Sequence, residues 1–509
     1  MSAEPGPAGA PHRVAITLTV MLASIMQALD NTIANVALPR IQGSLSTTQD
    51  QMSWVLTSYI IAAAIMTPLS GWLAGQVGRK RVFIYSIVGF TVTSALCGVA
   101  QTLPEIVLAR LFQGAFGAAL IPMSQAVLLD INPPEKHARA MALWVMGVVI
   151  GPILGPALGG WLTENYNWRW VFYINVPFGI LAYLGTVSFM PETQVRKSRF
   201  DFFGFTSLSV AIGTFQLMLD RGQLKDWFSS TEICIEAGIA ALALYLFVVH
   251  MLTTDKQPFV SPGMFKDRNF LTGSVFIFVV GVVLFATLAL LPPLLQDQMN
   301  YPVVLTGMVT APRGVGTLAA MFIVGRLMGK VDTRLIIAAG FLLTAYSLYQ
   351  MTGFYLQMDS SQVVLSGLSQ GLGTGLVYVP LAAITFATLS PQYRNEGTAM
   401  FSLIRNVGSS VGISAVEVLL TRNSQIMHAR LAEQVTPYGA GLHGVTPATL
   451  HSTAGLVGLN GLVSDQATMI AYNNDFQLMM VLTLCAIPLI VLLRTGKPAD
   501  KNAEPMVME

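Results

Sequence analysis

The chain has 509 residues, 53% of them hydrophobic and 11% charged, with a formal net charge of +2. Soluble domains carry about 25% charged residues, so this composition predicts a polytopic membrane protein. The small net charge without a basic run argues against nucleic-acid binding. The 6 histidines and 3 cysteines form no metal-binding or nucleophilic constellation, and no ATP-binding motif is present. We therefore expect no enzyme activity, no metal and no cofactor.

Apolar runs of about 20 residues are long enough to cross a bilayer. By that measure the sequence predicts an all-α membrane protein with fourteen transmembrane spans. The spans are 14–38, 54–74, 82–101, 105–128, 140–162, 170–190, 202–219, 232–252, 269–292, 303–326, 335–354, 362–389, 397–421 and 475–494.

Lysine and arginine are concentrated in every second connection between the spans. Because positively charged loops stay on the cytoplasmic side, this distribution predicts that both termini are cytoplasmic. The long polar segment 422–474 then lies outside. Its first part has helical apolar spacing, and we interpret the whole segment as two helical extensions of the neighbouring spans, joined by a flexible tip.

The chain also repeats itself. Gly71 to Arg81, after span two, matches Gly325 to Arg334, after span ten, and Leu108 to Gly114 resembles Leu365 to Gly371. The offsets are 254 and 257 residues, so we expect two pseudo-symmetric six-helix bundles. The predicted domains are a cytoplasmic N-tail (1–13), an N-terminal bundle (14–190), a connector with two extra helices (191–260), a C-terminal bundle (261–494) and a cytoplasmic C-tail (495–509).

Two charges stand inside apolar spans. Asp30 lies about 13 Å inward from Pro39 in span one, and Arg110 about 9 Å inward from Pro104 in span four. Both depths are measured from the outer side, so the two side chains could meet. Intramembrane charges usually mark a substrate or proton pathway. The alternative is a static ion pair that holds the two spans together. The repeat gives Arg110 no twin, because Gly367 stands at its position.

Further polar residues fall inside the spans, and a polar stripe on an apolar helix is expected to face a cavity. We expect the substrate cavity to be lined by Gln27, Asn31, Asn35, Gln113, Arg313, Arg405 and Glu417. Together with Asp30 and Arg110 these residues carry a small positive charge. The hypothesis is that substrates are neutral, weakly acidic or at most monocationic amphiphiles. Either Arg313 or Arg405 could instead support the backbone or snorkel.

Span five has small residues at every fourth position, which lets another helix approach closely. Prolines beside them weaken the backbone hydrogen bonding. Packing alone and packing against a moving partner are both open interpretations. The residues concerned are Gly147, Gly151, Pro152, Gly155, Pro156 and Gly159.

These motifs resemble those of the major facilitator superfamily. They are R-x-x-Q-G in span four, the glycine–proline pattern of span five, and G-x-L-A-x-x-x-G-R-K after span two, which contains Gly71, Gly78, Arg79 and Lys80. Fourteen spans, LDNTIANVALP in span one and the segment from Trp168 to Gly179 are similar to the fourteen-helix EmrB/QacA branch. The segment from Leu219 to Ser230 and the long outer loop resemble its EmrB type. The family's loop motif usually has an acid where this chain has Gly75.

The resemblance implies a drug:proton antiporter that works by alternating access, with Asp30 and Arg110 in proton coupling and the loop and span-five motifs in conformational change. Proton motive force would drive export of hydrophobic toxic compounds across the bacterial inner membrane. It also implies a periplasmic adaptor of the EmrA type and an outer-membrane channel of the TolC type, and 422–474 is the expected adaptor contact. The alternatives are a dedicated metabolite or siderophore exporter, and a receptor or scaffold on a transporter fold.

Overall fold

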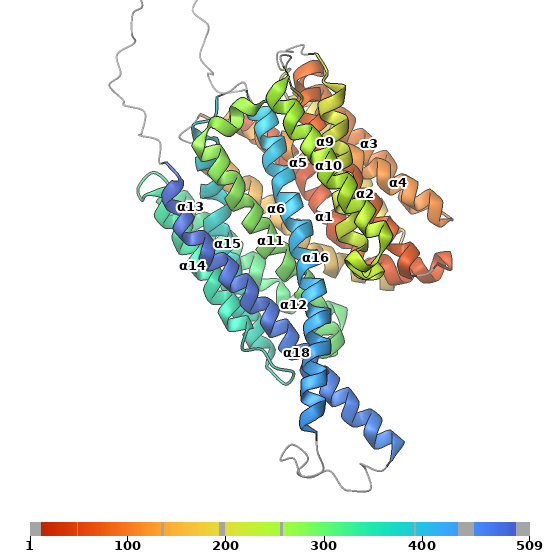
Figure 1. Ribbon diagram of the computed structural model, residues 1–509. Coiled ribbons are helices and arrows are strands. Elements are labelled where there is room, and N and C mark those ends of the chain that lie inside the picture. The colour runs from red at the N-terminus through yellow and green to blue at the C-terminus, as the bar shows by residue number, and fades with distance from the viewer. Residues whose placement is uncertain are drawn as a thin grey trace, which may run out of the picture.

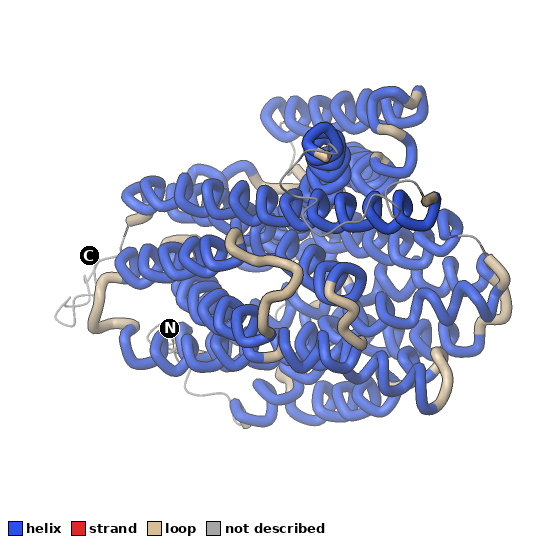
Figure 2. Tube along the Cα trace, turned by 90° about the horizontal axis from the view of Figure 1, so that it is seen from below, coloured by secondary structure: helices blue, strands red, loops and turns tan. Residues whose placement is uncertain are grey.

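The computed structural model describes residues 12–47, 49–133, 137–192, 199–254, 258–390, 393–435 and 452–494. Within these ranges the chain is helical and contains no strand (Figure 2). Among them, 13 helical stretches are long and apolar enough to cross a membrane. Each coincides with a predicted span, and the remaining predicted span, 140–162, lies within a 29-residue helix. The prediction of an all-α, multi-pass membrane protein is therefore confirmed.

The first half of the chain supplies the N-terminal bundle and the two additional helices. Its helices are α1 (Arg13–Leu45), α2 (Gln49–Val77), α3 (Arg79–Val99), α4 (Leu103–Gly117), α5 (Leu120–Ile131), α6 (His137–Asn165), α7 (Trp170–Tyr173), α8 (Asn175–Phe189), α9 (Phe202–Arg221) and α10 (Thr231–Thr253), with short helical turns at η2 (Gln223–Lys225) and η3 (Trp227–Ser229).

The second half supplies the C-terminal bundle. Its elements are η4 (Pro262–Lys266), α11 (Arg268–Pro293), the π-helical turn η5 (Leu294–Gln298), α12 (Val303–Thr310), α13 (Pro312–Leu327), α14 (Thr333–Met351), α15 (Ser360–Ala387), α16 (Arg394–Gln434), α18 (Thr453–Ala486) and η8 (Ile487–Leu492).

Two predicted spans are interrupted. Span four divides into α4 and α5 around Ala118, because Pro122 has no N–H to donate to the carbonyl four residues earlier. Span ten divides into α12 and α13 at Ala311, which directly precedes Pro312. Both interruptions are predictable from proline alone, although continuous helices were expected there.

The helices of each bundle pack against one another. In the N-terminal bundle α1 contacts α6 and α8, and α4 contacts α2 and α3; in the C-terminal bundle α11 contacts α15 and α16, and α15 contacts α13 and α14. The two bundles meet where α16 packs against α2 and α5, and where α6 packs against α12 and α13. Large buried side chains such as Trp144 and Phe401 belong to a hydrophobic core that includes both bundles.

The additional helices α9 and α10 pack against each other, and α9 also contacts α2 and α16. Asp201 fixes the start of this pair. Its Oδ1 accepts from the Gly204 backbone N–H at 2.9 Å, its Oδ2 accepts from the Phe259 N–H at 3.0 Å, and the His250 ring lies 3.0 Å away. One carboxylate thus ties α9, α10 and the segment leading to α11 together.

At the opposite end of the molecule, α16 and α18 run together past the other helices (Figure 1). The Ser424 and Thr468 hydroxyls lie 3.0 Å apart, and the His428 ring lies 3.0 Å from the Asn460 side chain. The two expected helical extensions are therefore present, and the second starts at Thr453, earlier than predicted. The expected flexible tip, 436–450, lies outside the described residues. We call this end the hairpin face and the opposite end, with Arg13 and Arg494, the terminal face.

Candidate functional site

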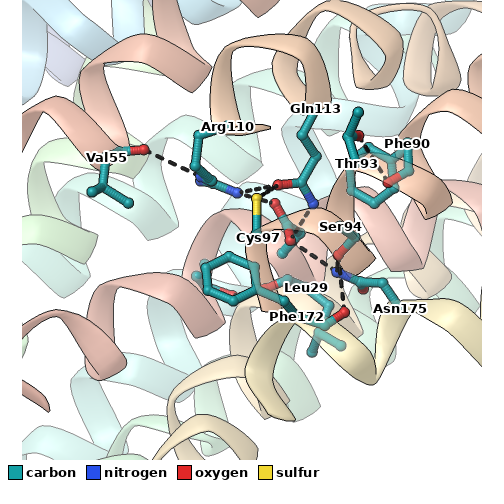
Figure 3. A network of polar contacts seen from close by, with 12 residues as sticks. Leu29, Val55, Phe90, Thr93, Ser94, Cys97, Arg110, Gln113, Phe172 and Asn175 are labelled. Carbon is teal, nitrogen blue, oxygen red and sulfur yellow. Dashed lines mark hydrogen bonds and ion pairs between the residues drawn. The ribbon is translucent and has the colours of Figure 1, made fainter. Parts of the chain in front are cut away.

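Asp30 and Arg110 form an ion pair buried inside the N-terminal bundle. Nη1 of Arg110 lies 2.6 Å from Oδ2 of Asp30, and the two side chains are 1% and 0% exposed. Nη1 also donates to Oε1 of Gln113 at 2.9 Å, and Nε2 of Gln113 donates to Oδ1 of Asp30 at 2.9 Å. Figure 3 shows Arg110 and Gln113 approaching from the same helix, α4. Their spacing of three residues places both on one helical face.

The other side of the Asp30 carboxylate is held by Asn175, the first residue of α8. Nδ2 of Asn175 donates to Oδ1 of Asp30 at 2.8 Å and to the Ser94 hydroxyl at 3.0 Å (Figure 3). Ser94 in turn donates to the Phe172 carbonyl. The carboxylate of α1 therefore accepts from three side chains on α4 and α8, so three helices meet at one charge. All these groups are buried.

Arg110 is held in place independently of Asp30. Its Nε donates to the Val55 carbonyl of α2 at 3.2 Å, and its guanidinium lies 4.2 Å from the centre of the Tyr59 ring. A cation against an aromatic face gains about 1–2 kcal/mol when desolvated. These contacts allow the guanidinium to stay in position if the carboxylate is neutralised.

The C-terminal bundle repeats this geometry with neutral groups. Thr287 and Gln370, each 257 residues after Asp30 and Gln113, are both buried, and Nε2 of Gln370 donates to the Thr287 hydroxyl at 3.1 Å. Gly367 stands where Arg110 would be, and Oε1 of Gln370 has no hydrogen-bond partner within the described chain. The contact made by the glutamine side chain is thus retained in both halves, whereas the Asp30–Arg110 ion pair has no counterpart at the matching positions of the C-terminal bundle.

The remaining residues of the expected cavity differ in burial and in their contacts. Gln27 is buried near the ion pair, whereas Asn31, Asn35 and Glu417 are exposed. Arg313 donates from Nη2 to the Leu284 carbonyl at 3.5 Å, which is a backbone-supporting contact. Arg405 donates from Nη1 to the Tyr378 hydroxyl at 3.0 Å and from Nη2 to Oδ1 of Asn406 at 3.3 Å.

The loop motif after α2 supplies an ionic connection between the bundles at the terminal face. Arg79, the first residue of α3, pairs with Asp130 near the end of α5. Nη1 of Arg394, the first residue of α16, lies 3.6 Å from Oδ1 of the same Asp130. Gly78 allows the sharp turn that presents Arg79, because its φ is +92°. An acid of α5 therefore contacts the arginine of the loop motif, and one carboxylate joins the two bundles.

Other residues of these motifs take structural positions. Gly71 is buried within α2, and Nζ of Lys80 donates to the Val187 carbonyl at 3.0 Å. In α6, Gly147 and Gly151 face Met21 and Ala28 of α1. Gly155 faces Thr32 of α1, and Gly159 is buried. The side chains of Pro152 and Pro156 lie outside the described part. The close partner of the glycine ridge is therefore the helix that carries Asp30.

The polar network contains residues that the sequence reasoning did not select. Asn175, Ser94 and Tyr59 complete the surroundings of Asp30 and Arg110. Asn175 could have been found, because an amide near the outer end of an apolar span needs a partner there. Ser94 and Tyr59 carry no such signal, since hydroxyls occur throughout these helices.

A fold of two six-helix bundles joined by a connector, with an internal charge network, defines a membrane transporter. Residues 20–413 match the family model described as "Major Facilitator Superfamily". The fatty acid resistance protein FarB of Neisseria gonorrhoeae is 37% identical over 93% of this chain and 95% of its own length. The multidrug export protein EmrB of Escherichia coli (strain K12) is 37% identical over 84% of this chain and 83% of its own.

The chain therefore belongs to the major facilitator superfamily. The crystal structure of the human organic anion transporter MFSD10 (TETRAN) has the same fold, with a TM-score of 0.59 at 13% identity, over 93% of this chain and 100% of that one. The expected resemblance is confirmed, and with it a multi-pass membrane transporter.

Proposed function

We propose that this protein is a proton-coupled multidrug exporter, a drug:proton antiporter that works by alternating access. The observation that carries the proposal is the Asp30 carboxylate, which is fully buried and held by Arg110, Gln113 and Asn175. An intramembrane carboxylate that a neighbouring arginine stabilises can take up a proton once that partner moves away. Proton motive force is the energy source in this proposal.

The arrangement of the two bundles supports a cycle of this kind. Asp130 joins them at the terminal face, while Asn31 and Asn35 in the half of α1 nearer the hairpin face are exposed. We assign this conformation to the state that opens towards the outside. Protonation of Asp30 would remove its charge from Arg110, loosen α1 against α4, and favour the opposite state.

Amphipathic hydrophobic compounds are the proposed cargo. If Arg405 and Arg313 line the transport pathway, their positive charge would favour neutral or weakly acidic substrates over dications. The 37% identity to a fatty acid resistance protein agrees with a weak acid as one substrate. Preferential export of dicationic dyes, with no export of weak acids, would contradict this assignment.

A tripartite assembly is the proposed setting, with the transporter in the bacterial inner membrane and both termini cytoplasmic. The helical extensions of α16 and α18 project beyond the bundles and offer a surface for a periplasmic adaptor, which would lead to an outer-membrane channel (Figure 1). Deletion of 435–460 should leave transport in proteoliposomes intact and abolish resistance in cells. Loss of transport in proteoliposomes would instead assign the segment to the transporter itself.

The experiment that tests the function uses purified protein in proteoliposomes with a pH-sensitive dye inside. Addition of a hydrophobic drug should release protons in proportion to drug flux, and a proton ionophore should remove the signal. Flux of a single metabolite alone would favour a dedicated exporter. No proton-dependent flux of any compound would favour a receptor or scaffold.

A further inference from the structure

A second carboxylate is buried in the membrane part of the C-terminal bundle, outside the Asp30 network. Asp475 is 1% exposed and lies on α18. It shares one helical face with Tyr472, Phe476 and Met479, all of them buried, at the spacing of three and four residues that defines a core-facing stripe. An aspartate therefore occupies a position in the apolar stripe of a helix that packs against α11, α14 and α16.

Neither oxygen of Asp475 has a hydrogen-bond partner among the described residues. Its neighbours in sequence are fixed, so the side chain has little freedom to turn away. Nδ2 of Asn473 donates to the Phe354 carbonyl at 3.0 Å, and the Phe476 ring meets the Phe354 ring edge-to-face at 5.9 Å. An ionised carboxylate in such surroundings is unfavourable by several kcal/mol or more, and a buried group of this kind is neutralised instead.

Among the described residues, the ionisable groups that can be placed near Asp475 carry no positive charge. Tyr472 lies within electrostatic range of both Asp475 and Asp297, which belongs to η5. Helix α11 has no ionisable side chain after Arg268, and η8 has none at all. On α14, Tyr346 and Tyr349 are exposed. On α16, the register set by Ser424 and Thr468 brings Glu417 to the same height, but its charged neighbour is Asp220 of α9.

We propose that Asp475 is a second proton-binding site, which holds a proton in this conformation and releases it when α18 moves relative to α11 and α14. The ligand is a proton because, in the described part of the chain, the ionisable groups placed near Asp475 are the Tyr472 phenol and, next to that phenol, the acid Asp297. That the bound proton belongs to the transport cycle rests on the proposed antiport function. That Asp475 holds a proton in this conformation does not depend on the antiport function, since it follows from the burial of the carboxylate.

Asp475 also lies at the base of the helical extension of α18, so its protonation could change the position of that extension. The helical extension of α18 that begins at Thr453 reaches the membrane part at Asn473 to Asp475, and Asn473 is bonded to the connection between α14 and α15. Loss of the proton would place a bare charge at this junction. Because that charge must reach water or a cation, deprotonation would drive the base of the α18 extension away from the bundle.

The test is a pH titration of the full-length protein in nanodiscs, followed by the infrared carbonyl stretch of protonated carboxyl groups. The parent should show a band that disappears as the pH is raised. Asp475→Asn should lack this band, Asp475→Glu should shift it, and Asp30→Asn and Asp297→Asn should retain it. If the band is unchanged in Asp475→Asn, or is absent from the parent at every pH, the proposal is wrong.

A second readout connects the site to transport and separates the two proposals. In proteoliposomes Asp475→Asn should still move drug but release about twofold fewer protons per drug, as expected if two carboxylates each carry one proton. A parent without any proton-coupled flux would overturn the proposed function, while the infrared titration would still decide the proton site. An unchanged ratio in Asp475→Asn would remove the site from the cycle. Asp475→Glu controls for misfolding, because it keeps the acid.

Discussion

Arg110 and Asp30 are paired without contact to solvent, at 2.6 Å and with side chains 1% and 0% exposed. A pair of this kind is weak evidence for stability, because desolvation offsets much of the attraction, but removal of one partner is strongly destabilising. The additional bonds from Gln113 and Asn175 make the pair specific to one geometry. The network therefore suits a switch that must be held firmly in one state and released in another.

Arg110→Lys should keep the charge but abolish coupled transport. A lysine is a point charge and cannot bond to Val55, Gln113 and Asp30 at once, as the guanidinium does. Arg110→Ala should in addition lower the free energy of unfolding by about 3–5 kcal/mol, because it leaves a buried charge unpaired. Thermal unfolding and drug-driven proton release measure the two effects. Parent-level exchange in Arg110→Lys would show that the guanidinium geometry is unimportant.

Gly151→Ala should impair transport through the position of α1. A Cβ at this residue would lie 2.7 Å from the backbone carbon of Ala28 and the backbone nitrogen of Leu29, so α1 must shift next to Asp30. Overpacking of this kind is unfavourable by about 1–3 kcal/mol. Gly325→Ala in α13 is the matched control, because nothing lies within 4 Å of its Cβ. Equal activity of the two variants would argue against close packing of α6 and α1.

Asp130→Asn should favour opening at the terminal face. It removes the carboxylate that both Arg79 and Arg394 contact, and a partly exposed ion pair contributes about 1 kcal/mol or less. Amide hydrogen exchange at the ends of α5 and α16 should therefore be a few times faster in the variant. Glu164→Gln is the control, because it removes an exposed acid at the hairpin face. Identical exchange in Asp130→Asn and the parent would show that this ionic connection does not hold the bundles together.

Asp201 should make the stability of the connector depend on pH, with a loss of stability in acid. Burial raises the pKa of this carboxyl, but the N–H groups of Gly204 and Phe259 and the His250 ring outweigh that effect and leave the pKa below its ordinary value. A lowered folded-state pKa gives stability that is present above the unfolded-state pKa and lost as pH falls through the folded-state value. Asp201→Asn should therefore unfold at lower temperature than the parent at neutral pH. The difference should shrink below the ordinary range of an aspartate, and a difference independent of pH would refute this.

Much of the architecture is predictable from hydropathy and the internal repeat, because a bilayer requires apolar helices of fixed length. The repeat offset places Thr287 and Gln370 opposite Asp30 and Gln113 without any coordinates. The contact of Asp30 with Arg110 was a possibility that their similar depths, measured from the same side, already indicated. In contrast, Asp130 as the partner of Arg79 depends on how α3 and α5 pack, and no local pattern indicates it.

Two other features escaped the sequence reasoning for a related reason. Asn175 and Asp475 both lie at the outer start of an apolar span, where a polar residue reads as a boundary rather than as part of the interior. Their burial is decided by the connections above them, α7 in one case and the helical extension of α18 in the other. The need of a buried amide or carboxylate for a partner is the signal that could have identified such residues.

Asp30→Asn in proteoliposomes tests the central claim most directly. Asparagine keeps the shape and can still accept from Arg110, so the variant should fold and bind drug like the parent. Because the amide cannot take up the proton that would release Arg110, the cycle should stop, and drug-driven proton release, including any through Asp475, should be abolished. A proton-to-drug ratio equal to that of the parent would contradict the account and remove Asp30 as the proton carrier.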